Sequence, residues 1–191
     1  AAYQAWLEEC IAALMNVFGI TRESIFLKLR KKRQRFEQYE KVDHTANRVE
    51  VAEDGFRFLV NLSDYIDIGL FLDHRPLRKK VQSDSRGKHV LNLFCYTGAF
   101  SVHAASGGAL TVTSVDLSTT YLNWARENFK LNGINIIWYS FLRADAKLWV
   151  KQNPVRLYDI IVLDPPTMSK SRTATSAFDV QLDHRQLIQD T

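Results

Sequence analysis

The residues with the most specific chemical signature are Asp164-Pro165-Pro166, at the end of the apolar stretch 158–166. Two consecutive prolines restrict the backbone that follows the carboxylate. A rigid loop that holds a carboxylate and backbone carbonyls beside a flat ring suits group transfer to a nucleobase. A simple turn that ends a strand is the alternative. We predict that Asp164, Pro165 and Pro166 form the reaction centre.

Two further carboxylates stand at the ends of expected strands. Asp116 ends the stretch 110–116, 18 residues after Gly98, and a carboxylate there can accept two hydrogen bonds from a ribose diol. Asp145 follows the stretch 136–144, where a short acidic side chain can face the amino group of adenine. Either carboxylate could instead cap the helix that follows, and Ser118 could also cap the helix after Asp116.

The turn after the first strand of the expected sheet, residues 92–98, reads N-L-F-C-Y-T-G and lacks the pattern G-x-G-x-x-G. Tyr96 and Thr97 stand where a glycine would let the backbone approach a pyrophosphate. A nucleoside without phosphates therefore fits better than a dinucleotide, which argues against an NAD-dependent dehydrogenase. Gly98 is also explained by a tight turn into a helix.

The sequence Asp73-His74-Arg75 lies just before the expected sheet. Its opposed charges suit a zwitterion with an α-amino and an α-carboxylate group, and the alternative is a salt bridge between two domains. His74 and His103 are isolated histidines without the spacing of metal ligands, so we predict no zinc site. Cys95 lies in an apolar stretch and is expected to be a core residue, not a nucleophile.

A basic run at 28–35 carries six positive charges and no acid. Such a run can neutralise phosphates and orient RNA without reading its bases, although many charge runs are only solvated. Phe36 and Tyr39 follow it and could stack on bases, and Lys79, Lys80, Arg86 and Lys88 could extend the track. The predicted RNA-binding residues are Lys28, Arg30, Lys31, Lys32, Arg33 and Arg35.

These residues must be positioned by a sheet, because strands and helices are predicted to alternate from residue 89 onward. The stretches 89–96, 110–116, 136–144 and 158–166 are nearly continuous apolar runs, typical of parallel strands covered on both faces. This pattern predicts a doubly wound α/β sheet with ligands beyond the carboxyl ends of its strands. A helix is expected at 178–189, and we expect more sheet after Thr191, because 160–163 would otherwise lie at an edge.

A small α+β unit is expected before the sheet. Apolar residues at helical spacing predict a helix over 3–18 with Gly19 as its cap, and 25–30 is expected to be a strand. The stretches 48–53 and 56–62, joined by Asp54-Gly55, predict a β-hairpin. We therefore expect a small domain over 1–70, with RNA binding as its role, and a catalytic domain over 71–191.

The composition is that of an ordinary globular protein. Of its 191 residues, 46% are hydrophobic and 24% are charged, which excludes a disordered chain, and the net charge of +4 suits an anionic partner. Two cysteines cannot build a disulfide framework and fit a reducing compartment. The sequence has no apolar run of about 20 residues and no signal peptide, so we expect a cytoplasmic protein without a membrane span.

Several of these motifs occur together in one known family. The chain contains F-L-D-H-R, V-L-N-L-F-C-Y-T-G-A, S-V-D-L-S…Y-L-x-W-A-x-x-N and L-D-P-P-T-x-S…F-D-V-Q-x-D-H, in that order. In these motifs it resembles the S-adenosylmethionine-dependent methyltransferases of ribosomal RNA. It is most similar to the C-terminal, guanine-N7-methylating half of the bifunctional bacterial 23S rRNA guanine methyltransferases. The similarity runs through essentially all 191 residues.

The resemblance implies a Rossmann-like class I methyltransferase fold whose C-terminal strands lie beyond this chain, and a second methyltransferase domain fused upstream. It implies S-adenosylmethionine as cofactor, S-adenosylhomocysteine as product and large-subunit ribosomal RNA as substrate. Asp164-Pro165-Pro166 would then lie beside the transferred methyl group. The implied cofactor contacts are Asp73, Arg75, Asn92, Phe94, Tyr96, Gly98, Asp116, Leu117, Asp145 and Ala146. The chain departs from many amino-methylating relatives at Thr167, where they carry an aromatic residue, so the target base must be clamped by other residues.

Guanine N7 has an in-plane lone pair and can attack a sulfonium methyl group without losing a proton. We therefore expect Asp164 to position the base or the methyl group and not to accept a proton. Cytosine C5 methylation through a cysteine nucleophile is the alternative reaction, but neither cysteine follows the D-P-P sequence. A non-catalytic RNA-binding module is the alternative from another class.

Overall fold

The computed structural model describes residues 2–28, 48–64, 67–153, 155–169 and 178–191. The chain divides into two compact units, Ala1–Lys32 and Arg33–Thr191. Of the basic run, only Lys28 falls among the described residues, and Arg30, Lys31, Lys32, Arg33 and Arg35 lie outside them. Within the described ranges, no helix is both long enough and apolar enough to cross a membrane.

The first unit contains helix α1 (Ala2–Phe18) and the 3-10 turn η1 (Arg22–Ser24). Gly19 has a φ of +62°, and the Ile20 N–H donates to the Met15 carbonyl at 3.2 Å. This 6→1 bond ends the helix as a glycine cap should, so the predicted helix and cap are confirmed. The strand predicted over 25–30 is wrong for residues 25–28, which pair with no described strand.

The second unit is built on four parallel strands in the order β5-β4-β3-β6. They are β3 (His89–Leu93), β4 (Thr111–Asp116), β5 (Tyr139–Arg143) and β6 (Ile160–Leu163), so all four predicted strands are confirmed. Strand β3 ends three residues earlier than predicted because Phe94 and Tyr96 adopt φ values of +57° and +51°. This left-handed backbone turns the chain out of the sheet.

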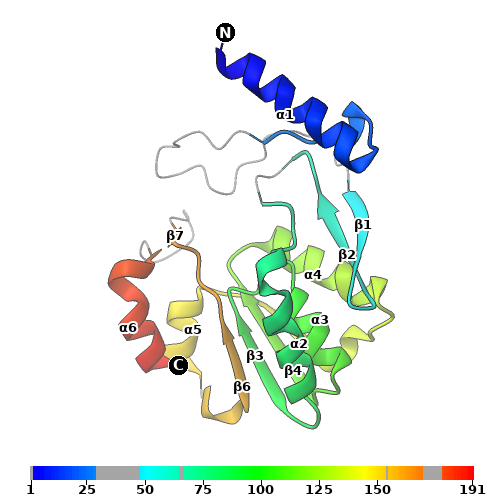
Figure 1. Ribbon diagram of the computed structural model, residues 1–191. Helices are drawn as coiled ribbons and strands as arrows, with labels where there is room; N and C mark the ends of the chain where they lie inside the picture. The colour runs from blue at the N-terminus through cyan, green and yellow to red at the C-terminus, as the bar shows by residue number, and fades with distance from the viewer. Residues whose placement is uncertain (1, 29–47, 65–66, 154, 170–177) are drawn as a thin grey trace. The chain divides into compact units, whose positions relative to one another are not determined.

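Helices cover both faces of the sheet, as the apolar strands indicated (Figure 1). One face carries α2 (Arg75–Asp84), α3 (Ala99–Ser106) and α4 (Thr119–Leu131), and the other carries α5 (Ala146–Gln152) and α6 (Val180–Asp190). The strands serve both cores by alternation, since Val90 faces the first layer of helices and Leu91 the second. The sequence did not predict α2.

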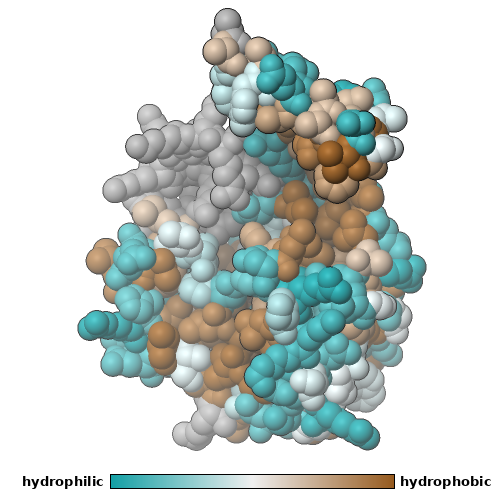
Figure 2. Space-filling view, viewed as in Figure 1, coloured by the Kyte–Doolittle hydropathy of each residue, from teal (hydrophilic) through white to brown (hydrophobic). Residues whose placement is uncertain are grey.

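The face seen in Figure 2 carries both hydrophobic and hydrophilic areas. In the view of Figure 1, hydrophobic residues gather over β6, the end strand of the sheet, and hydrophilic residues lie over α2.

Helix α6 begins two residues later than predicted because β8 (Phe178–Asp179) pairs with β7 (Met168–Ser169). Asp179 then caps α6, its carboxylate accepting the Gln181 N–H at 3.0 Å.

The predicted hairpin is confirmed as β1 (Arg48–Glu53) and β2 (Phe56–Asn61). It packs on α4 through polar contacts: Asn128 accepts the Leu59 N–H at 2.9 Å, and the Trp124 indole donates to the Leu59 carbonyl at 3.0 Å. The hairpin assigned to the small domain 1–70 therefore contacts a helix of the sheet unit directly.

A buried ion pair connects the hairpin to α2. The Arg78 guanidinium donates to both carboxylate oxygens of Glu53, at 2.8 and 2.7 Å, and to the Phe71 carbonyl at 2.8 Å. His103 lies beside it, with Nε2 3.8 Å from Glu53, and its ring nitrogens have no hydrogen-bond partner. Burial and the Arg78 charge lower the pKa of His103 to about 4, so this histidine is neutral at pH 7.

We expect Arg78→Met to lower the free energy of unfolding by about 3–5 kcal/mol, because it leaves the Glu53 carboxylate buried without a partner. Urea denaturation of the complete protein measures this change. Lys80→Met is the matched control, since Lys80 is exposed and pairs with Asp84 at the surface, and its effect should be much smaller. Adding Glu53→Gln to Arg78→Met should recover part of the loss, and equal losses in the Arg78 and Lys80 variants would contradict the assignment.

Candidate active site

The predicted carboxylates all lie at the carboxyl-terminal ends of the parallel strands. Asp116 ends β4, Asp145 follows β5, and Asp164 follows β6. Leu93, the last residue of β3, pairs with Val115 on one side and with Leu163 on the other, so Asp116 and Asp164 flank the turn that leaves β3. The grouping at the carboxyl ends of the strands is therefore confirmed.

Asp116 joins the turn after β3 to the turn after β4. Its Oδ2 accepts the Tyr96 N–H at 2.9 Å, and its Oδ1 accepts the Ser118 N–H at 2.8 Å. Burial raises the pKa of Asp116 to about 6, although backbone N–H groups of Ser118, Tyr96 and Leu117 oppose the rise. The helix cap of α4 is Ser118, whose hydroxyl accepts the Tyr121 N–H. Asp116 is thus mostly ionised at pH 7, and the cap of α4 is the other residue that the sequence offered for it.

The turn after β3 is held in an unusual backbone conformation. Left-handed non-glycine residues such as Phe94 and Tyr96 cost on the order of 1–3 kcal/mol each and often mark functional sites. The Tyr96 hydroxyl donates to the Asp67 carbonyl at 3.0 Å, and its ring packs edge-to-face on Tyr121. Phe94 packs against Phe178. The strained turn is therefore fixed by contacts on several elements.

Gly98 is required by packing. Its φ is +74°, and a Cβ atom there would lie 2.7 Å from the Cβ of Ala125 in α4. The tight turn into α3, one of the two interpretations of this glycine, is thus what the structure shows. Its predicted contact with a cofactor stays a prediction.

Asn92 lies in a buried hydrogen-bond network, and its predicted contact with a cofactor stays a prediction. Its side chain is buried, and its amide donates to Ser101 at 2.8 Å, which in turn bonds Ser114 at 2.8 Å. The network joins β3, α3 and β4 inside the protein. A polar residue in a central strand can serve its neighbours as well as a ligand, and the sequence did not distinguish the two.

Asp145 caps helix α5, with Oδ1 accepting the Lys147 N–H at 3.0 Å. This was the alternative to an adenine contact, which stays a prediction. Ala146 is buried in the core. Leu117 is half-buried next to Asp116, and its carbonyl accepts a bond from Arg143 at 3.3 Å.

Arg75 turns away from the strand ends. Its guanidinium donates twice to Asp54 in the hairpin turn, at 2.9 and 2.6 Å, and Lys79 bonds the same carboxylate at 2.9 Å. The bond with Arg75, followed by that with Lys79, holds the pKa of Asp54 well below its usual range. This salt bridge is the alternative that the sequence left open, and the predicted contact of Arg75 with a zwitterionic ligand stays a prediction. Asp73 remains exposed.

His74 meets Asp164, a contact that the sequence did not predict. His74 Nδ1 lies 3.4 Å from Asp164 Oδ2, and its Nε2 lies 3.9 Å from Asp73. Burial raises the pKa of Asp164, while His74 lowers it and Asp73 raises it further. His74 looked isolated because its partner lies 90 residues away in the chain. Its position just before the expected sheet was the one feature of the sequence that pointed to the site.

The loop after Asp164 is anchored as well as restricted by its prolines. Pro165 and Pro166 are half-buried, and the Thr167 carbonyl accepts the Val180 N–H at 3.0 Å. The Thr167 side chain is exposed. Cys95 is buried and burial raises the pKa of its thiol, which confirms it as a core residue and argues against a cysteine nucleophile.

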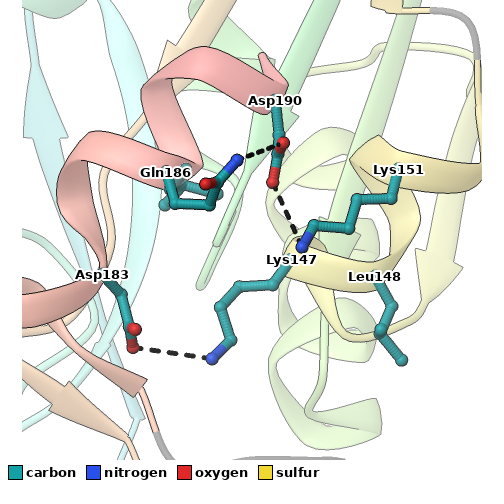
Figure 3. A pocket seen from close by; sticks show the side chains of 7 residues that line it. Lys147, Leu148, Lys151, Asp183, Gln186 and Asp190 are labelled. Atoms are coloured by element: carbon teal, nitrogen blue, oxygen red, sulfur yellow. Dashed lines mark hydrogen bonds and ion pairs between the residues drawn. The ribbon is translucent and has the colours of Figure 1, made fainter.

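A separate small pocket lies between α5 and α6 (Figure 3). Two ion pairs cross it, Lys147 with Asp183 at 3.6 Å and Lys151 with Asp190 at 3.4 Å. None of its lining residues belongs to the predicted site, and its charges are matched across the helix contact. Over the described part of the chain, no three acidic, histidine or cysteine residues are grouped to hold a metal ion.

Residues 24–189 match the family of S-adenosylmethionine-dependent methyltransferases. The chain is 53% identical over 174 residues to the ribosomal RNA large subunit methyltransferase K/L of Hahella chejuensis, covering 91% of this chain and 24% of that protein. It is 45% identical over 188 residues to the ribosomal RNA large subunit methyltransferase K of Neisseria meningitidis, covering 97% and 53%. The chain thus spans between a quarter and about half of these relatives.

The fold is similar to that of SMU.776, a methyltransferase crystallised with S-adenosylhomocysteine. The TM-score is 0.69 at 33% sequence identity, over 78% of this chain and 39% of that one. This similarity confirms the predicted α/β class I methyltransferase fold. Together, the strand-end geometry, the family match over most of the chain and the shared fold show that the chain belongs to the S-adenosylmethionine-dependent methyltransferases.

Proposed function

We propose that the complete protein transfers a methyl group from S-adenosylmethionine to guanine N7 in large-subunit ribosomal RNA. The observation that carries the proposal is the placing of Asp116 and Asp164 on either side of the strained turn after β3. The proposal for the substrate rests on the named relatives and, for guanine N7, on the resemblance of the motifs. A ribosomal RNA substrate would place the reaction in the cytoplasm.

The residues present suit the nucleoside part of the cofactor. A carboxylate has about four acceptor positions, and the backbone bonds that Asp116 accepts do not use all of them. Asp116 can therefore bind ribose hydroxyls while it still holds Tyr96 and Ser118 in place. Asp145 and Leu117 would border the adenine, and the exposed carboxylate of Asp73 would face the α-amino group.

S-adenosylmethionine supplies an electrophilic methyl group on a positively charged sulfur. As the N7–carbon bond forms, the carbon–sulfur bond breaks and the positive charge moves to the purine, with no proton removed. The ionised Asp164 carboxylate at the edge of the base would stabilise that developing charge. The two prolines would hold the carboxylate in position, so its role is electrostatic and positional.

The function is tested by the modified nucleosides in ribosomal RNA from cells that lack the gene. We expect 7-methylguanosine to be lost from the large-subunit RNA, and to return when the wild-type gene is restored. Mass spectrometry of digested RNA measures it. Loss of 5-methylcytidine in place of 7-methylguanosine would contradict the proposal.

We expect Asp164→Asn to lower the rate of methyl transfer on the order of a hundredfold, because it removes the negative charge near the base. Initial rates with purified full-length protein measure this. Asp159→Asn is the matched control. Asp159 lies just before β6, at the amino-terminal end of the same strand, and its carboxylate accepts the His89 N–H at 2.7 Å. This control should keep the wild-type rate, and a full rate in Asp164→Asn would refute the electrostatic role.

The affinity for S-adenosylhomocysteine should fall as the pH drops through about 6, the pKa to which burial raises Asp116. The ionised carboxylate is the better acceptor for ribose hydroxyls, so one pH unit below the pKa should weaken binding about tenfold. Calorimetry between pH 5 and pH 7.5 measures it. Asp116→Asn should bind more weakly at pH 7.5 and show little pH dependence. A pH dependence that persists unchanged in this variant would assign it to another group.

A further inference from the structure

The 3-10 turn η2 (Leu72–His74) and the residue before it present exposed apolar side chains beside the reaction centre. Phe71 is 40% exposed and Leu72 is 70% exposed. The centre of the Phe71 ring lies 5.8 Å from that of His74 and 5.6 Å from that of Tyr96. Since His74 contacts Asp164, a group resting on Phe71 would lie close to that carboxylate.

The backbone under Phe71 is held in place. Three carbonyls of the segment accept bonds from the sheet unit: Asp67 from Tyr96 at 3.0 Å, Gly69 from Thr97 at 2.6 Å and Phe71 from Arg78 at 2.8 Å. Arg78 is itself fixed by its buried ion pair. The Phe71 ring is therefore exposed although its backbone is anchored, a combination that suits a preformed binding surface.

The described residues that directly follow Asp164, up to Thr167, include no aromatic side chain. Thr167 follows the prolines, is exposed and has no aromatic ring. A target base that is turned out of its helix loses stacking with its neighbours, and an aromatic side chain can replace that stacking. Among the described residues beside Asp164, Phe71 is a large exposed ring that could do so.

We propose that Phe71 is the stacking surface for the target purine and that His74 fixes the carboxylate of Asp164 at the edge of the same base. This inference rests on the proposed function and names the residues that hold the substrate. The base would lie flat on Phe71, with His74 between that ring and Asp164. His74 is confined there by the Phe71 and Phe100 rings and by the carboxylates of Asp73 and Asp164.

The test of Phe71 uses the full-length protein with protein-free large-subunit ribosomal RNA. We expect Phe71→Ala to lower kcat/KM for the RNA by on the order of ten- to a hundredfold, and Phe71→Tyr to keep most of it. The affinity of Phe71→Ala for S-adenosylhomocysteine should stay within about twofold of wild type, which also shows that the variant is folded. Leu77→Ala is the matched control, because Leu77 is an exposed apolar residue of α2 and should not change kcat/KM.

An unchanged kcat/KM in Phe71→Ala would overturn the proposal. So would an equal loss of S-adenosylhomocysteine affinity, because Phe71 would then belong to the cofactor site. The wild-type product decides the proposed function separately. A methylated nucleoside other than 7-methylguanosine would refute methylation at guanine N7. Comparing the Phe71 variants on the base that is methylated would still test stacking.

His74 is tested as a positioning residue by the pH profile of the rate. Its contact with Asp164 opposes the rise that burial causes in the pKa of that carboxyl group. Removing the imidazole in His74→Ala should therefore raise that pKa and move the acidic limb of the profile to higher pH, since the ionised carboxylate is the active form. His74→Gln, which can still donate to Asp164, should keep more of the rate at neutral pH. An acidic limb that stays in place in His74→Ala would overturn this part of the proposal.

Discussion

The buried ion pair of Arg78 with Glu53 is the interaction on which the positions of Phe71 and His74 depend. It joins the hairpin to α2, and the same guanidinium holds the Phe71 carbonyl. Losing one partner would leave a buried charge unpaired, which is costly, so the hairpin, α2 and the backbone at Phe71 must keep their relative positions. His74 and Phe71 are placed by this constraint, and through His74 so is the environment of Asp164. The stability of the hairpin and the chemistry of the site are thus connected by one side chain.

The Asp116 carboxylate has a corresponding role for the turn after β3. It accepts backbone N–H groups from the turns after both β3 and β4, so it stabilises a turn that contains two left-handed non-glycine residues. The same burial that makes these bonds effective raises its pKa toward neutrality. Asp116 thus shapes this turn through backbone hydrogen bonds, and the proposed function would give the same carboxylate a ribose to bind.

The chemistry proposed for this site places few demands on proton transfer. A lone pair attacks a sulfonium carbon, and the charge moves from sulfur to purine, so the protein must align the groups and stabilise the charge. The observed arrangement fits that demand: a rigid Asp-Pro-Pro loop, a histidine that opposes protonation of Asp164 and a fixed aromatic surface. The buried thiol of Cys95 is unsuited to the cysteine-dependent alternative.

The sequence by itself determined the parallel sheet, the hairpin, the cap of α1 and the carboxylates at the strand ends, because these follow from local periodicity and turn chemistry. Only the tertiary structure decided which side chains meet. Arg75 binds Asp54, Asn92 lies in a buried network, and His74 finds Asp164 across 90 residues. A charged or amide side chain shows its chemistry in the sequence but not its partner, since the partner is set by how the elements pack. Strand β3 ends early for the same reason: the left-handed turn is stabilised by Asp116, which is distant in the chain and adjacent in the fold.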